Sequence, residues 1–148
     1  MAQTFVEYNG KGIWIRDSLL ELPMGYISET IELINNPPTW LKELDIWIKI
    51  KAQGEYFGVD ISWDEILSDD TKITKFQAII SETIQFLKCK PQFLPVEEIN
   101  KFRIKEGKAP TWTQPIERES VEKVLEVLLL LFSDLVKNKE NDFEDFLI

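Results

Sequence analysis

Three carboxylates near the middle of the chain, Asp60, Asp64 and Glu65, have the residue type and spacing that could support chemistry. They surround Trp63, and a carboxyl group in an apolar setting beside an ionised one is the pair that glycosidases use. The same oxygens could hold a hard cation. The favoured interpretation is simpler. Asp64 and Glu65 occupy the first turn of a helix, where negative charge is stabilising.

The other common catalytic side chains are scarce. The chain contains no histidine and one cysteine, Cys89, which excludes a nucleophile activated by imidazole and a zinc site of the usual type. Its glycines follow neither the GxGxxG nor the GxxxxGK spacing that cradles phosphate. We therefore expect no cofactor and no metal, and an enzyme is the less favoured class. A lone cysteine also fits a reducing cytoplasm.

The chain is acidic, with a formal net charge of −9. Such a surface repels phosphate backbones and anionic membranes, so we expect neither nucleic acid nor a membrane among its partners. It would attract a basic protein and speed the encounter. The N-terminus does not resemble a signal peptide, and the most apolar segment, 124–136, is too short to span a bilayer. We expect a cytoplasmic protein, monomeric or homodimeric.

Two hairpins are predicted in the first half of the chain. Residues 4–17 read as two short strands around Asn9-Gly10, which supplies the positive φ angles of a tight turn. Between 45 and 63, apolar residues alternate with polar ones on both sides of Gly54, a period of two that predicts a second hairpin.

Helices are predicted around these strands, at residues 18–34, 38–44, 69–89, 96–103 and 117–137. In the first, Ser18 and Glu21 have capping-box spacing and Pro23 predicts a kink or a restart. The order favours an α+β fold, with one antiparallel sheet of about four strands packed against helices. The long apolar C-terminal helix lies in its core. We expect a single domain over 1–138 and an acidic tail over 139–148.

Aromatic and charged residues of the second hairpin form the first candidate binding surface. Trp47 and Lys49 would lie on its outer face with Tyr56 and Asp60, and Trp14 would extend this face if the hairpins share a sheet. Aromatic anchors ringed by charges are typical of protein-binding hot spots. The alternative is that a helix covers the face.

Two further segments are candidates for contact with a partner. Trp112, in a proline-bounded loop, either pins that loop to the core or is exposed as an anchor. Leu129 and Leu130 interrupt the polar stripe of the last helix, so another segment covers them or a second copy does. The acidic tail contributes Glu140, Asp142, Glu144 and Asp145.

Taken together, these features predict a non-enzymatic protein-binding module. In size and acidity the chain resembles the immunity proteins that neutralise bacterial toxins, many of which are basic nucleases; the resemblance is one of composition. It implies that acidic complementarity blocks a basic active site. Two alternatives stay open. One is a carboxylate-dependent hydrolase using Asp60, Asp64 and Glu65, and the other is a structural subunit that self-associates through Leu129 and Leu130.

Overall fold

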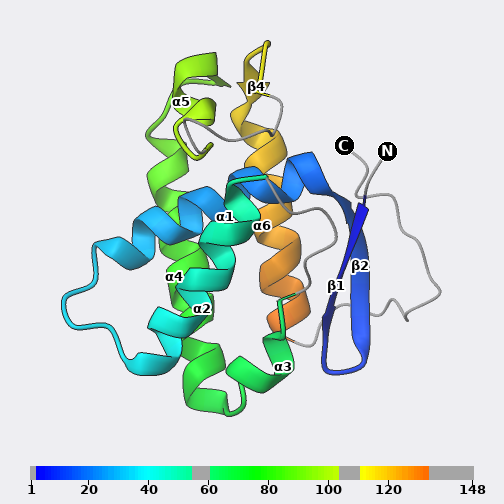
Figure 1. The fold of residues 1–148 in the computed structure, drawn as a ribbon, viewed down its shortest axis with the longest axis vertical. Helices are drawn as coiled ribbons and strands as arrows, with labels where there is room; N and C mark the ends of the chain where they lie inside the picture. The colour runs from blue at the N-terminus through cyan, green and yellow to red at the C-terminus, as the bar shows by residue number, and fades with distance from the viewer. Residues whose placement is uncertain (1–2, 55–60, 104–110, 134–148) are drawn as a thin grey trace.

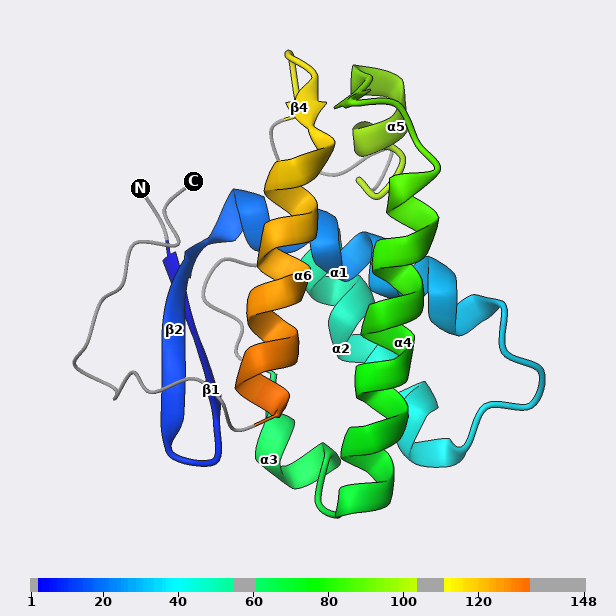
Figure 2. The same ribbon diagram turned by 180° about the vertical axis from the view of Figure 1, so that it is seen from behind.

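The computed structural model describes residues 3–54, 61–103 and 111–133. In chain order its elements are β1 Gln3–Tyr8, β2 Lys11–Arg16, α1 Asp17–Glu32, α2 Thr39–Ala52, α3 Trp63–Ile66, α4 Asp70–Lys88, β3 Phe93–Leu94, α5 Val96–Asn100, β4 Ile116–Glu117 and α6 Arg118–Phe132. Helices α4 and α6 run side by side in opposite directions (Figures 1 and 2). Helix α1 crosses both of them, α2 packs on α1, and the β1–β2 hairpin stands to one side.

The N-terminal hairpin forms as the sequence predicts. β1 pairs antiparallel with β2, and the turn residues Asn9 and Gly10 have φ angles of 55° and 76°. Positive φ at both central residues matches the strand twist of a two-residue hairpin. The alternating inner side chains are buried: Val6, Tyr8, Ile13 and Ile15.

Helix and strand are mixed, as expected for an α+β chain, but the four strands do not form one sheet. β3 and β4 form a separate antiparallel pair that joins the end of α4 to the start of α6. Beside it, the backbone N–H of Arg118 donates to the carbonyl of Gln92 over 2.8 Å. Strands of two residues carry no periodicity, so the sequence pattern does not predict them.

The segment predicted as the third strand is part of helix α2, so the prediction of a second hairpin is wrong there. Residues 46–52 do alternate between apolar and polar types, but this period of two is short. The buried side chains of α2 are spaced three or four residues apart, and their packing on α1 decides the conformation. The seam they form is Leu41, Leu44, Ile48 and Ala52. The predicted fourth strand falls partly on 55–60, outside the described residues.

Helix α1 differs from its prediction in two details. It runs without a break through Pro23, so the predicted kink or restart is wrong. Its N-cap is Arg16, which makes no side-chain capping bond, so the predicted capping box of Ser18 and Glu21 is also wrong. A proline inside a helix costs about 3 kcal/mol. Every residue from 19 to 28 is buried, and packing on three neighbouring helices outweighs that cost.

Helices α4 and α6 confirm their predictions where they are described. The Asp69 side chain accepts the backbone N–H of Lys72 over 2.9 Å, which caps α4. The α6 seam is buried in the core, and it consists of Val121, Leu125, Leu128 and Phe132. Helix α5 lies inside the predicted range 96–103.

An aromatic cluster joins the hairpin to the helices. The Phe132 ring lies 5.3 Å from Tyr8, 5.1 Å from Trp63 and 5.4 Å from Phe76, measured between ring centroids. These residues come from α6, β1, α3 and α4. Burying each large apolar side chain stabilises the fold by about 1.5–3 kcal/mol. The cluster therefore fixes β1 and α3 relative to each other.

Candidate functional site

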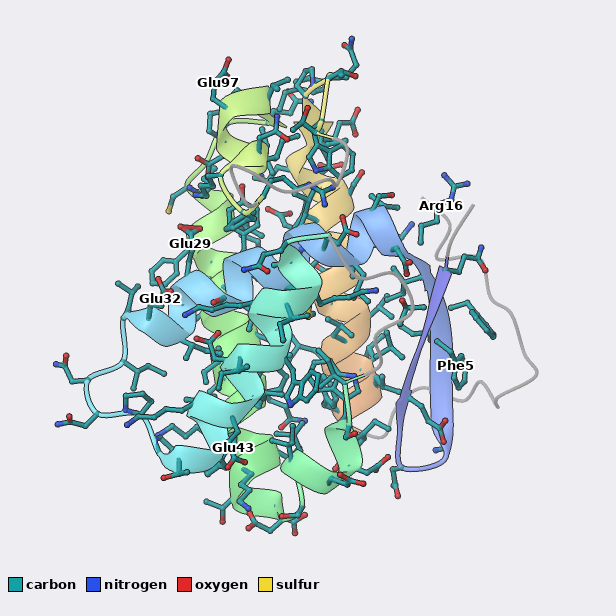
Figure 3. All side chains as sticks on the ribbon, in the orientation of Figure 1. Phe5, Arg16, Glu29, Glu32, Glu43 and Glu97 are labelled. Atoms are coloured by element: carbon teal, nitrogen blue, oxygen red, sulfur yellow. The ribbon has the colours of Figure 1, made fainter. Side chains whose placement is uncertain are left out.

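The outer face of the hairpin carries an aromatic pair. Phe5 and Trp14 are opposite each other in the strand register, and their ring centroids are 5.1 Å apart. Phe5, labelled on the hairpin in Figure 3, lies on the strand face opposite the buried side chains of Val6 and Tyr8. Its ring also covers Gly12, where an added Cβ would overlap it. Glycine at this position therefore lets the Phe5 ring lie against the neighbouring strand.

Beside this pair, a hollow of about 310 Å³ separates the hairpin from α3, and we call it the hairpin hollow. Phe5 and Glu7 line one wall, and residues 61–65 line the other. The side chains of Glu7, Asp64 and Glu65 are exposed. Among the described residues, no lysine or arginine lines this hollow. The described side chains that line it therefore carry negative charge, and its edge is aromatic.

One hydrogen bond holds the two walls of the hairpin hollow together. The carboxylate of Asp64 accepts the backbone N–H of Asn9 over 2.9 Å. Asn9 belongs to the hairpin turn and Asp64 to the first turn of α3. Since the Trp63 ring also anchors α3 in the core, the Asp64 carboxylate has a fixed position beside the hairpin.

The predicted carboxylate group is described only in part. Asp64 and Glu65 lie in the first turn of α3, as the helix-terminus interpretation predicts, and both are exposed. Trp63 is 3% exposed and packs on core rings. Asp60 lies outside the described residues. The hydrolase interpretation therefore stays a prediction.

The predicted outer sheet face is divided between two elements. Trp14 lies on the hairpin, whereas Trp47 and Lys49 lie on α2, so these three residues do not share a sheet. Residues two positions apart in a strand, such as Trp47 and Lys49 in the prediction, share one face. In a helix the same two residues are separated by a rotation of about 200°. Trp47 is 44% exposed, and Lys49 pairs with Glu32. Tyr56 lies outside the described residues.

The other predicted contact residues have distinct surroundings. Trp112 is partly buried against the core, and Asn100 holds its backbone through bonds of 2.7 Å and 3.0 Å. Leu129 is partly buried and Leu130 is 46% exposed, so self-association stays a prediction. Four tail residues lie outside the described range, namely Glu140, Asp142, Glu144 and Asp145.

The structure contains a buried ion pair between distant segments that the sequence did not predict. Lys51 is 2% exposed, and its Nζ lies 2.8 Å from the Thr4 hydroxyl and 3.3 Å from the Asp17 carboxylate. The Thr4 hydroxyl also donates to Asp17. A buried charge is tolerated only when it is paired, so these three residues fix α2 against β1 and α1. The signal is helical spacing, because Lys51 follows Leu44 and Ile48 along the α2 seam.

A second buried pair lies next to the first. Arg103 Nη2 lies 2.9 Å from Glu21 Oε2, and both side chains are nearly buried. Burial raises the pKa of the Glu21 carboxyl, although the positive charges of Arg103 and Lys51 oppose this shift. Arg103 also donates to the carbonyl of Gln53 over 3.2 Å. It does so across Gly54, where a Cβ would overlap the guanidinium group.

A third polar cluster anchors α5. One oxygen of Glu98 accepts hydrogen bonds from Tyr26 at 3.1 Å and Lys101 at 2.7 Å, and pairs with Lys90 at 2.9 Å. Burial by itself would raise the pKa of Glu98. The two lysines have the larger opposite effect, and the pKa falls to about 2. Burial also raises the pKa of the Tyr26 hydroxyl, and the negative charge of Glu98 adds to that shift. Because Tyr26 comes from α1, Glu98 from α5 and Lys90 from the segment that follows α4, the cluster holds these parts of the chain together.

Comparison with known proteins gives no separate guide to these surfaces. The chain matches no protein-family model, no curated protein and no solved structure. Over 3–54, 61–103 and 111–133, no three acidic or cysteine side chains gather as ligands for a metal ion. Within the same ranges, the helices lack the combined length and apolar character needed to cross a membrane.

Proposed function

We propose that the chain is a non-enzymatic module that binds a basic protein at the hairpin hollow. The observation that supports this is the lining of the hollow. Glu7, Asp64 and Glu65 expose their side chains around it, Phe5 forms its edge, and no lysine or arginine is among the described residues that line it. An aromatic contact ringed by charge is the composition of a protein-binding hot spot.

The size and charge of the hairpin hollow suit a lysine or arginine side chain from the partner. The guanidinium or ammonium group would lie near carboxylates from two elements, and its stem would contact the Phe5 ring. The net charge of −9 steers a basic partner towards the chain over distances that depend on ionic strength. Binding should therefore weaken as salt is added.

Inhibition of a toxin or nuclease is the form of this function that size and acidity favour. A basic active site that contacts phosphate would be covered by the acidic surface of the module. The chain would then act by occupying the site, without turning over a substrate. Resemblance of composition to immunity proteins supports this form, and the hairpin hollow supplies a surface on which to test it.

The test is affinity capture from a native lysate at low and then moderate salt, with three versions of the chain. The double variant Glu7→Lys/Glu65→Lys reverses the charge of the hollow and spares the Asp64 bond to Asn9. The double variant Glu119→Lys/Glu126→Lys makes the same change in net charge on α6, at two exposed carboxylates. Thermal unfolding establishes that each version is folded.

We expect the wild-type chain and the α6 variant to capture the same basic protein, and the hollow variant to lose it. Moderate salt should weaken capture by the first two. Equal capture by all three folded versions would show that the hairpin hollow is not the contact. A captured partner that is acidic would contradict the proposal in its general form.

A further inference from the structure

A second hollow, of about 280 Å³, lies between α1 and α2 on a different part of the molecule. Its lining includes small residues, Gly25 and Ser28 from α1 and Ala52 from α2, and all three are buried. Residues 101 and 102, which follow α5, complete its lining. We call it the α1–α2 slot. Its volume falls just below the range of about 300–1,000 Å³ that holds drug-sized ligands, so any ligand is small.

The α1–α2 slot has charges of opposite sign on different elements. Glu29 and Glu32 are three residues apart on α1, which puts them on the same helix face, and Figure 3 shows both along that helix. Lys49 comes from α2 and Lys101 from the segment after α5. The pair Glu32–Lys49 is 2.9 Å long, and the pair Glu29–Lys101 is 3.0 Å long.

Both ion pairs can exchange partners at little cost. In the first, the lysine and glutamate side chains are 46% and 57% exposed. In the second, they are 33% and 45% exposed. Exposed pairs of this kind stabilise a fold by about 0–1 kcal/mol.

Each lysine also keeps a second carboxylate that would hold it in place during such an exchange. Asp45 lies 3.1 Å from the Lys49 ammonium, and Glu98 lies 2.7 Å from the Lys101 ammonium. Glu29 and Glu32 can therefore turn to a ligand while the lysines stay where they are.

We propose that the α1–α2 slot binds a small zwitterion of the α-amino acid class. The ammonium group of the ligand lies against Glu29 and Glu32, and its carboxylate lies towards Lys49 and Lys101. When Glu29 and Glu32 turn to the ligand, each lysine loses one of its two carboxylates, and the carboxylate of a zwitterion replaces it. A simple amine leaves that contact unreplaced, and a simple carboxylate leaves the glutamates without a new partner. This ligand is additional to the protein partner proposed above, and its binding does not depend on the hairpin hollow.

Calorimetric titration of the whole chain with a series of free α-amino acids of increasing side-chain size tests the proposal. Ethylammonium chloride and sodium propionate, at matched ionic strength, are the singly charged comparisons. The variants Lys49→Gln and Glu32→Gln each remove one charge from the slot. Lys75→Gln and Glu82→Gln are matched controls, because they remove exposed charges from α4.

We expect at least one amino acid to bind saturably and both comparison ions to bind at least about tenfold more weakly, a difference of about 1.4 kcal/mol. Each slot variant should weaken the binding by about the same factor, and the α4 controls should leave it unchanged. Absence of saturable binding across the series overturns the proposal. Equal binding of ethylammonium, or equal binding by folded slot variants, overturns it as well.

Discussion

The ammonium group of Lys51 lies 3.3 Å from the carboxylate of Asp17, and the two side chains are 2% and 3% exposed. Removing either partner leaves the other charge buried without compensation, which costs about 3–5 kcal/mol. We therefore expect Lys51→Met and Asp17→Asn each to lower the free energy of unfolding by about this amount. Urea denaturation measures it.

The double variant Lys51→Met/Asp17→Asn separates the ion pair from its surroundings. Because it leaves neither charge of this pair buried without its partner, it should lose clearly less stability than the sum of the two single losses. Additive losses in this cycle would mean that the two groups do not interact.

Gly25 allows the ring of Phe102 to rest directly on α1. A Cβ at this position would lie 2.5–2.6 Å from three atoms of the ring, so Gly25→Ala must displace it. Overpacking of this kind costs about 1–3 kcal/mol, which exceeds or cancels the gain in helix propensity of about 1 kcal/mol. We expect a net loss in the midpoint of urea unfolding. The same substitution in a Phe102→Leu background should cost less, and an equal cost would rule out this contact as the cause.

Glu98 makes stability depend on pH in the acid range. Burial opposes its ionisation, but the lysine partners lower its pKa from the model-compound value of 4.5 to about 2 in the folded state. A carboxyl group whose pKa is lower in the folded state stabilises the fold at pH values above its pKa in the unfolded state. That stability is lost as pH falls from about 4.5 to about 2. The shift corresponds to at most on the order of 3 kcal/mol.

Glu98→Gln should therefore flatten the fall of the unfolding free energy over this pH window. Glu97→Gln, at the exposed neighbouring carboxylate on α5 (Figure 3), is the matched control and should retain it. Chemical denaturation at several pH values measures both. A wild-type slope that persists in Glu98→Gln would assign the effect to other carboxyls.

The side chain of Asn100 holds the backbone of Trp112 from both sides, accepting its N–H and donating to its carbonyl. Replacement by alanine leaves these partly buried groups without partners, at a cost of about 1–3 kcal/mol. We expect Asn100→Ala to destabilise the fold and to shift Trp112 fluorescence towards that of a hydrated indole. Asn100→Asp keeps the acceptor alone and should have an intermediate effect. A Trp112→Phe background identifies the emitting residue.

Local signals predicted the parts of the fold that depend on few residues. The Asn9-Gly10 turn specifies its hairpin through backbone geometry, and Asp69 caps α4 through one bond to a nearby N–H. The α2 segment is different, because its alternating Ile46, Ile48 and Ile50 satisfy a strand pattern over a short window. Its helical conformation depends on packing against α1, which no local pattern specifies.

The same distinction explains the candidate site. Asp64, Glu65 and Trp14 were predicted from residue type, and they lie in or beside the hairpin hollow. Glu7 and Phe5 were not, because their importance comes from the pairing of β1 with α3 across more than fifty residues. Lys51 could not be assigned to a buried position while its segment was predicted as a strand with an outer face.

The polar links inside the molecule also constrain the order of folding. Lys51 and Thr4 are separated by 47 positions, Arg103 and Gln53 by 50, and Tyr26 and Glu98 by 72. Closing loops of this length costs chain entropy before any bond is gained. We expect these contacts to form after the local helices and the first hairpin, so that they select the native arrangement late in the reaction.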